Sequence, residues 1–471
     1  MDDAGPGAAA DGFFSRREGR PMDEAFDLDV TELGSRYRDR TLSPVEVEQG
    51  LSARIARLDP ELGAFTALAG EEARTAARQA EAELAAGIDR GPLHGVPVTV
   101  KDLCLTRDMP TAAGLRGFAE RLPRRDAAVV ARLREAGAVL VGKTYTTAGA
   151  FVDPAADRPF PRHPGRADIF PGMSSTGAGV AVAAGLCSVA IGTDTGGSIR
   201  LPSLCCGVSG FKPAYRRVDA EGVFESAPSL DHVGPIARSV ADLAAAMTAI
   251  GEGESPRALV TDLAAVRIGV DRRALELTGP KSRGAIERAI GLFGELGVTA
   301  VEVTLPPVAE LLAATGRLQA WETAAVHAAW YPAHRGDYGP GLAATIDRGR
   351  AMQAGDLDDF EAVRAAYRQQ LDALFATVDL IILPVLTIDT PTLDEWEGAM
   401  RQADPLGARF TKPFNVTGHP ALALPGGFDA DGLPLGFQLV ARPADEAFLL
   451  GAGIAFQKIS DWHRGLSRAL P

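Results

Sequence analysis

Apolar runs and charge-rich segments alternate along most of the chain. The runs at 96–100, 138–141 and 189–192 are short, rich in valine and other apolar residues, and bounded or interrupted by glycine or proline, which is typical of buried strands. Several segments between them carry many Ala, Glu and Arg residues, which favour helices. The alternation predicts an α/β fold with helices on the faces of a sheet.

Local capping signals place the helices of the first half. Ser43-Pro44-Val45-Glu46 is a capping box with proline at the first helical position. Gly87 is a stop signal, and Asp126 is expected to cap a helix that ends at Gly137. The helices expected in this half are 43–58, 71–86, 126–137 and the small-residue segment 177–184.

The second half repeats the same alternation. A strand that begins at Val266 is followed by a helix at 282–296 and a strand at 299–304. A long helical region comes next, at 308–376, and a strand at 379–384 follows it. We find no internal repeat and no long linker.

Composition excludes several classes of partner. At 471 residues, 46% of them hydrophobic, the chain can bury a large core, although length alone would allow about three domains. A net charge of −13 disfavours nucleic acid and anionic membranes. Residues 1–25 are acidic, lack the features of a signal peptide and are expected to form a disordered tail. The uncharged stretch 169–193 could span a bilayer by length, but its glycines and adjacent serines predict a loop and a packed helix.

The four cysteines have no zinc-type or redox spacing. Cys187, Cys205 and Cys206 lie among small apolar residues and are expected to be core thiols, whereas Cys104 follows the apolar run at 96–100. Unpaired cysteines suit a reducing compartment, so we expect a cytoplasmic protein.

Two serines in a glycine-rich segment carry the candidate chemistry. The segment 171–213 contains Ser174 and Ser198, both near glycines that allow sharp turns and a close approach of the backbone to a substrate. Neither serine has a histidine nearby, but Lys101 lies earlier in the apolar run GPLHGVPVTVKD. Amide hydrolysis needs a nucleophile, a base and donors to the oxyanion, and these residues can supply them.

The motifs resemble those of the amidase signature family over residues 26–460. Besides GTDTGGSIR around Ser198, the segments APSLDHVGPIARSVADLA, TKPFNVTGHPALALPGG and GLPLGFQLV are similar to family segments. The resemblance implies one domain at 26–471, built on a large mixed β-sheet with helices on both faces. Its catalytic core would lie at about 90–250, with a helical excursion at about 305–376. It also implies hydrolysis of a small-molecule amide through an acyl-enzyme, with no cofactor or metal.

The resemblance assigns the catalytic roles. Ser198 would attack the carbonyl, and Ser174 would relay the Ser198 proton to Lys101. The backbone N–H groups of Thr195, Gly196, Gly197 and Ser198 would form the oxyanion hole.

The base imposes a condition on its surroundings. A solvated lysine is almost always protonated at neutral pH, so Lys101 must be buried to be neutral for part of the time. Asp102 is expected to point to the opposite face of the strand, because successive strand residues alternate. Asp194 and Arg200 flank the nucleophile's turn and are expected to form a buried ion pair.

Other functions are weaker interpretations. Residues 137–144 formally match GxxxxGK[ST], but a helix precedes the first glycine and AVLV is strand-like, unlike a phosphate-binding loop. His94, His232 and His419 have no metal-ligand spacing. The amidase subunit of a tRNA-dependent amidotransferase remains the main alternative, although its family typically has GKTNMDEF where this chain has GKTYTTAGAF. A non-catalytic relative is disfavoured because all three catalytic positions are filled.

Substrate class is the open point. The family usually has PGGSSGG where this chain has PGMSSTG. Met173, Tyr145 and Phe151 are candidates to line an apolar substrate pocket, as are Trp321 and Trp330, although such residues more often lie in a core. The sequence also leaves a homodimer open.

Overall fold

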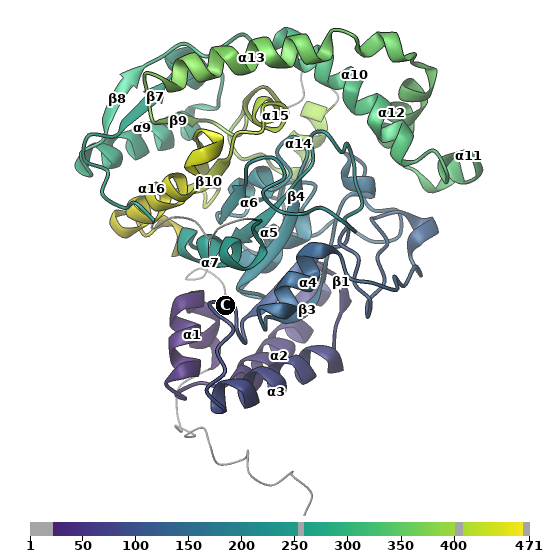
Figure 1. The fold of residues 1–471 in the computed structure, drawn as a ribbon, viewed down its shortest axis with the longest axis vertical. Coiled ribbons are helices and arrows are strands. Elements are labelled where there is room, and N and C mark those ends of the chain that lie inside the picture. Colours follow the sequence, from purple (N-terminus) through teal and green to yellow (C-terminus); the bar gives the residue numbers. More distant parts are fainter. Residues whose placement is uncertain (1–21, 253–258, 401–407, 465–471) are drawn as a thin grey trace, which may run out of the picture.

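The structure is a computed structural model (Figure 1) and describes residues 22–252, 259–400 and 408–464. The strands are β1 (Phe65–Leu68), β2 (Pro97–Lys101), β3 (Val139–Thr144), β4 (Val189–Asp194), β5 (Ser209–Lys212), β6 (His232–Ala237), β7 (Arg267–Val270), β8 (Thr299–Glu302), β9 (Leu380–Leu383), β10 (Ala421–Phe428) and β11 (Pro434–Val440). The α-helices are α1 (Val30–Arg38), α2 (Pro44–Leu62), α3 (Glu71–Ala85), α4 (Ala128–Glu135), α5 (Thr176–Ala183), α6 (Arg200–Cys205), α7 (Val240–Ile250), α8 (Arg272–Glu276), α9 (Pro280–Glu295), α10 (Ala309–Val326), α11 (Tyr331–His334), α12 (Pro340–Ala351), α13 (Phe360–Phe375), α14 (Leu393–Met400), α15 (Ala408–Val416) and α16 (Glu446–Ile459). The 3-10 helices are η1 (Met22–Asp27), η2 (Arg116–Phe118), η3 (Ala148–Ala150), η4 (Arg335–Asp337), η5 (Ala354–Leu357), η6 (Pro443–Asp445) and η7 (Trp462–Arg464).

One mixed sheet of eleven strands organises the described chain. Its order is β1-β3-β2-β4-β6-β5-β10-β11-β9-β7-β8. Strand β2 is parallel to β3 and β4, and β7 is parallel to β8 and β9. The strands between these two groups pair in antiparallel fashion. The predicted α/β class with a large mixed sheet is confirmed.

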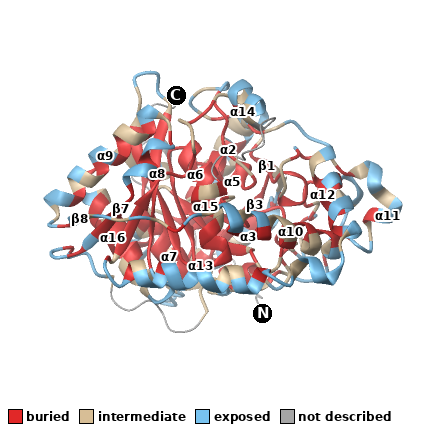
Figure 2. Ribbon diagram, turned by 90° about the horizontal axis from the view of Figure 1, so that it is seen from above, coloured by how far each residue is buried: buried red, intermediate tan, exposed pale blue. Residues whose placement is uncertain are grey.

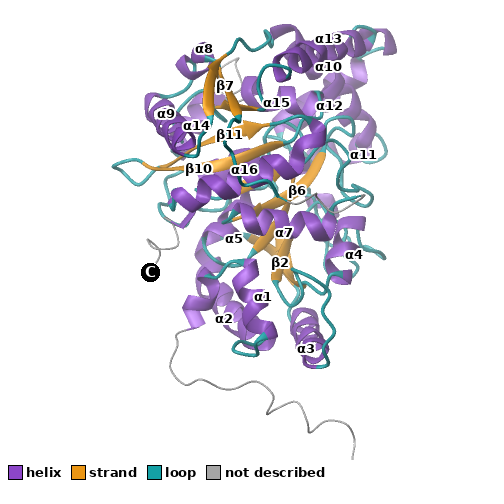
Figure 3. Cartoon of the chain, turned by 60° about the vertical axis from the view of Figure 1, so that its left-hand side comes forward, coloured by secondary structure: helices purple, strands orange, loops and turns teal. Residues whose placement is uncertain are grey.

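Helices cover both faces of this sheet. On β11, Phe437 packs against Phe293 of α9 and Phe456 of α16. The next residue, Gln438, accepts a hydrogen bond from Arg200 of α6. Because successive strand residues point to opposite faces, α9 and α16 lie on one face and α6 on the other. Figure 3 shows α16 and α7 in front of the strands, and Figure 2 shows buried strands between outer helices that carry the exposed residues.

The predicted helical excursion forms an arc at one end of the molecule. Helices α10, α12 and α13 follow one another along the top of Figure 1, opposite α1, α2 and α3. Helix α10 packs against α12, α13 and α15. Through α15, the excursion therefore reaches the segment that borders the candidate site.

The local predictions met different outcomes. Ser43 Oγ accepts the N–H groups of Val45 and Glu46, as the capping box predicted, but the helix continues to Leu62. The prediction that Asp126 caps α4 is wrong: Ala127 is the N-cap, and Asp126 binds arginines instead. Residues 1–21 of the predicted tail lie outside the described residues, and its last residues belong to η1.

Candidate active site

The carboxyl ends of two parallel strands bring the candidate residues together. Lys101 is the last residue of β2, and Asp194 is the last residue of the neighbouring strand β4. Ser198 lies in the turn between β4 and α6, and Ser174 lies just before α5. Ligands of α/β sheets commonly bind at this edge of the sheet.

Lys101 is fully buried and contacts one of the two candidate serines. Its Nζ donates to Ser174 Oγ at 2.7 Å and to Thr193 Oγ1 at 2.9 Å. Burial lowers the pKa of Lys101 to about 7, against the opposing influence of nearby groups that include Asp231 and Asp194. The condition set by the sequence is met, because about half of such a group is neutral at pH 7.

Asp102 directly follows β2, and its carboxylate pairs with Lys143 rather than with Lys101. Its Oδ1 is 3.2 Å from Lys143 Nζ, and its carboxylate also faces the N–H of Ala112. Lys143 Nζ further donates to Thr111 Oγ1 at 2.8 Å. Lys143 is thus a buried structural cation within β3, and the formal phosphate-loop pattern that contains it forms a strand.

The two serines of the 174–175 pair have different partners. Ser175 Oγ donates to the backbone oxygen of Thr193 at 3.1 Å and accepts its N–H at 3.3 Å. Ser174 is buried and faces Lys101. Ser198 is partly exposed, and its Oγ forms no hydrogen bond with another of the described residues. Its hydroxyl is therefore available to a substrate.

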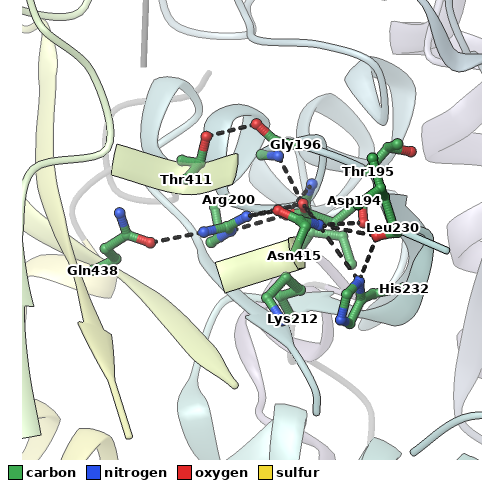
Figure 4. Close-up of polar contacts among 12 residues, drawn as sticks. Asp194, Thr195, Gly196, Arg200, Lys212, Leu230, His232, Thr411, Asn415 and Gln438 are labelled. Atoms are coloured by element: carbon green, nitrogen blue, oxygen red, sulfur yellow. Dashed lines mark hydrogen bonds and ion pairs between the residues drawn. The ribbon is translucent and has the colours of Figure 1, made fainter. Parts of the chain in front are cut away.

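A buried ion pair holds the turn that carries Ser198 (Figure 4). The Asp194 carboxylate accepts two bonds from Arg200, each at 3.0 Å, and the N–H groups of Gly197 (2.7 Å) and Ile199 (3.2 Å). Burial alone would raise the pKa of Asp194, but the charge and hydrogen bonds of Arg200 outweigh it and lower the pKa. The predicted Asp194–Arg200 pair is confirmed.

The N–H groups of this turn are not equivalent. The N–H of Gly197 is engaged by Asp194. Those of Thr195, Gly196 and Ser198 donate to no other group in the described part of the chain. Gly197 has φ +126°, and a Cβ there would lie 3.0 Å from Thr411 Oγ1, so this position requires glycine.

Sequence reasoning missed the residues that support the turn from far along the chain. Asn415 Nδ2 donates to Asp194 O at 2.7 Å and to Asp194 Oδ1 at 2.8 Å, and Gln438 accepts from Arg200. Asp231 accepts from Thr195 Oγ1 at 2.5 Å, and burial raises its pKa to about 7. All three missed residues lie in segments that resemble family segments, but no local pattern singles out their polar side chains.

The candidate substrate residues lie in different surroundings. Tyr145 is fully buried and its hydroxyl accepts the N–H of Ala155 at 2.8 Å, so its ring belongs to the scaffold in this structure. Met173 is partly buried against a cluster that contains Phe170 and Trp396. Phe151 packs, with Trp330, against a separate cluster formed largely by α10–α12 residues. Trp321 lies on α10 and is partly buried.

The remaining features considered in the sequence are the cysteines, the histidines, a metal site and a membrane span. The four cysteines are free and buried. His94, His232 and His419 bind Glu83, the Leu230 carbonyl and Thr417 respectively. Across residues 22–252, 259–400 and 408–464, no group of three His, Cys, Asp or Glu side chains could hold a metal ion. In the same ranges, no helix is both long enough and apolar enough to cross a membrane.

Comparison with known proteins decides the family. A family model described as Amidase matches residues 46–450. The chain belongs to the amidase signature family of hydrolases. A Mycobacterium tuberculosis protein named as a putative amidase, AmiD, is 41% identical over 93% of this chain and 95% of its own length. This amidase is therefore a hydrolase of the class that acts on the carbon–nitrogen bonds of linear amides.

Two further relatives cover nearly the whole amidase. One of the subunits of the glutamyl-tRNA(Gln) amidotransferase of Chloroflexus aggregans is 35% identical over 94% of this chain and 98% of its own. The solved peptide amidase from Stenotrophomonas maltophilia is 29% identical, with a TM-score of 0.81, over 93% of this chain and 98% of that one. The resemblance found in the sequence is confirmed at the level of the family.

Proposed function

We propose that this amidase hydrolyses a small-molecule amide through an acyl-enzyme on Ser198, with Ser174 and Lys101 as its proton-transfer partners. The observation that carries the proposal is the 2.7 Å hydrogen bond between Lys101 Nζ and Ser174 Oγ in a fully buried site. A neutral lysine there can accept a proton, and Ser198 is partly exposed, with a hydroxyl that no other described residue engages.

The reaction begins with transfer of two protons. Neutral Lys101 accepts the hydroxyl proton of Ser174, which in turn accepts the proton of Ser198 as Ser198 Oγ bonds to the amide carbon. The carbonyl oxygen becomes an oxyanion. When the carbon–nitrogen bond breaks, the proton returns through Ser174 to the departing amine. Water then attacks the acyl-enzyme and gives one proton to the same relay. When the bond between Ser198 Oγ and the acyl carbon breaks, the relay returns that proton to Ser198 Oγ, and the acid is released.

Backbone donors stabilise the oxyanion in this proposal. The N–H groups of Thr195, Gly196 and Ser198 are the candidates, because that of Gly197 already binds Asp194. Loss of one such donor typically costs about 3 kcal/mol in the transition state. The buried Asp194–Arg200 pair keeps the turn in place before the substrate arrives.

The amidase component of an amidotransferase is a second candidate, favoured by the 35% identity to the Chloroflexus protein. The two functions differ in whether the chain needs ATP and a second protein chain for its activity. We expect the purified chain, treated with EDTA and given no nucleotide, to release acid from some members of a panel of aryl, aliphatic and urea-type amides. Ser198→Ala should abolish this activity, whereas Ser52→Ala, on a distant helix, should retain it. Activity that appears only with ATP and a second protein chain would overturn independent amide hydrolysis in favour of the amidotransferase.

A further inference from the structure

A second lysine lies beside the turn that carries Ser198. Lys412 belongs to α15, and its neighbour Thr411 donates to the backbone oxygen of Gly196 at 2.6 Å. A methyl group added at Gly196 would lie 3.0 Å from Lys412 Cε and 3.9 Å from Lys412 Nζ. The ammonium group of Lys412 is therefore adjacent to a proposed oxyanion donor, although the reaction proposed above gives it no role.

No acidic residue of the described chain forms an ion pair with Lys412. Its Nζ donates to Gln319 Oε1 of α10 at 2.7 Å, a neutral partner. An ammonium group has three donors, so two remain for another acceptor. Most partly buried cations are paired, because an unpaired charge is costly to desolvate.

A second cation increases the local positive charge. Arg348 of α12 binds the backbone oxygen of Gly316 at 3.2 Å and forms no ion pair within the described ranges. Burial lowers the pKa of Lys412 to about 8, and the positive charge of Arg348 acts in the same direction. An anion bound here would relieve the desolvation of Lys412 and its repulsion from Arg348.

We propose that Lys412, positioned by Gln319, binds a carboxylate of the substrate, so that the enzyme prefers amides that also carry a carboxylate group. This inference rests on the proposed function, because it needs an amide bound at Ser198. The carboxylate would accept the two remaining Lys412 donors while the reacting carbonyl faces the turn at 195–198. Lys412 is thus a specificity-determining residue beside the turn that carries Ser198.

The test compares matched substrates. Malonamic, succinamic and glutaramic acids each have a diamide counterpart, in which a neutral amide replaces the carboxylate. N-acetylglycine and N-acetylglycinamide place the same difference on the leaving group. We expect the wild type to favour at least one acid over its neutral counterpart by tenfold or more in kcat/KM.

Variants then test whether Lys412 causes the preference for substrates that carry a carboxylate. Lys412→Met should lower the acid-to-neutral ratio by tenfold or more, mainly through the KM of the acid, and Lys412→Arg should restore most of it. Lys458→Met removes the same charge from an exposed position on α16 and should leave the ratio unchanged. Because the ratio compares two substrates on one preparation, partial misfolding of a variant does not change it.

Two outcomes would overturn this inference without contradicting the proposed function. One is a wild type that cleaves neutral amides and shows no preference for any acid. The other is an unchanged ratio in a Lys412→Met protein that an active-site serine probe still labels. A wild type that cleaves no amide of either kind would instead contradict the proposed function.

Discussion

The pH dependence of amide hydrolysis should follow the protonation of Lys101. Burial lowers its pKa from 10.5 to about 7. At pH 7 a solvated lysine is neutral in about one molecule in three thousand, whereas about half of a group with pKa 7 is neutral. Because the base acts in its neutral form, kcat/KM should rise about tenfold per pH unit below pH 7 and level off above it.

The same burial has a consequence for stability. The pKa of Lys101 is lower in the folded chain, so the unfolded chain binds the additional proton between about pH 7 and 10.5, and the contribution of Lys101 to stability rises with pH in that window. At about 1.4 kcal/mol per pH unit, charge burial costs on the order of 4 kcal/mol at pH 7. Lys101→Met removes this cost but leaves Ser174 and Thr193 without their donor, at about 1–3 kcal/mol each.

The assay combines kinetics and unfolding. We expect Lys101→Met to lower kcat by about 10²- to 10⁴-fold, while its free energy of unfolding in urea at pH 7 stays within about 2 kcal/mol of the wild type, since the two effects above largely cancel. Lys101→Arg keeps the charge but cannot accept a proton, so it should not recover activity. Near wild-type kcat in Lys101→Arg would refute proton acceptance at this position.

The pH profile needs a control for Asp231, because burial raises the pKa of this carboxyl group to about 7 as well. Its negative charge raises the pKa of Lys101, so Asp231→Asn should move the midpoint of the pH profile to lower pH and keep the transition. Disappearance of the transition in Asp231→Asn would identify Asp231 as the titrating group. A flat wild-type profile from pH 5.5 to 9 would contradict both assignments.

Two further substitutions test the surroundings of the nucleophile. Arg200→Met leaves the Asp194 carboxylate buried without its cation and should cost about 3–5 kcal/mol of unfolding free energy in urea. The control Arg74→Met breaks the exposed pair with Glu71 and should cost under about 1 kcal/mol. Equal losses of unfolding free energy in the two variants would argue against the role of burial. Met173→Ala should cost about 1 kcal/mol, below the 2–5 kcal/mol typical of fully buried sites, and leave the order of preferred amides unchanged; an altered order would place Met173 in the substrate pocket.

Local signals predicted the elements that depend on neighbouring residues. The apolar runs became β2, β3 and β4, and the Ser43 capping box begins α2. The order of the sheet could not be predicted in this way. Strand β10 pairs with β5 across about two hundred residues of chain, and no local pattern specifies such a partner. Asp126 failed as a cap because Arg107 and Arg134 compete for its carboxylate.

In the candidate site, too, the sequence predicted the features that depend on local chemistry and not those that depend on the tertiary fold. The condition that Lys101 be buried followed from its required chemistry, and the Asp194–Arg200 pair followed from the opposite charges that flank the turn of Ser198. Asn415 and Gln438 are 215 and 238 positions from Arg200. Their roles depend on the tertiary fold, which brings β11 and α15 beside the turn. The proximity of Lys412 to Gly196 arises in the same way.

Covalent labelling tests the nucleophile most directly. Ser198 is partly exposed in the turn held by Asp194 and Arg200, whereas Ser174 is buried against Lys101. A fluorophosphonate probe followed by peptide mass spectrometry should place the label on Ser198 in the wild type and find none at the site in Ser198→Ala. A label on Ser174 or Ser175 with Ser198 unmodified would contradict Ser198 as the nucleophile.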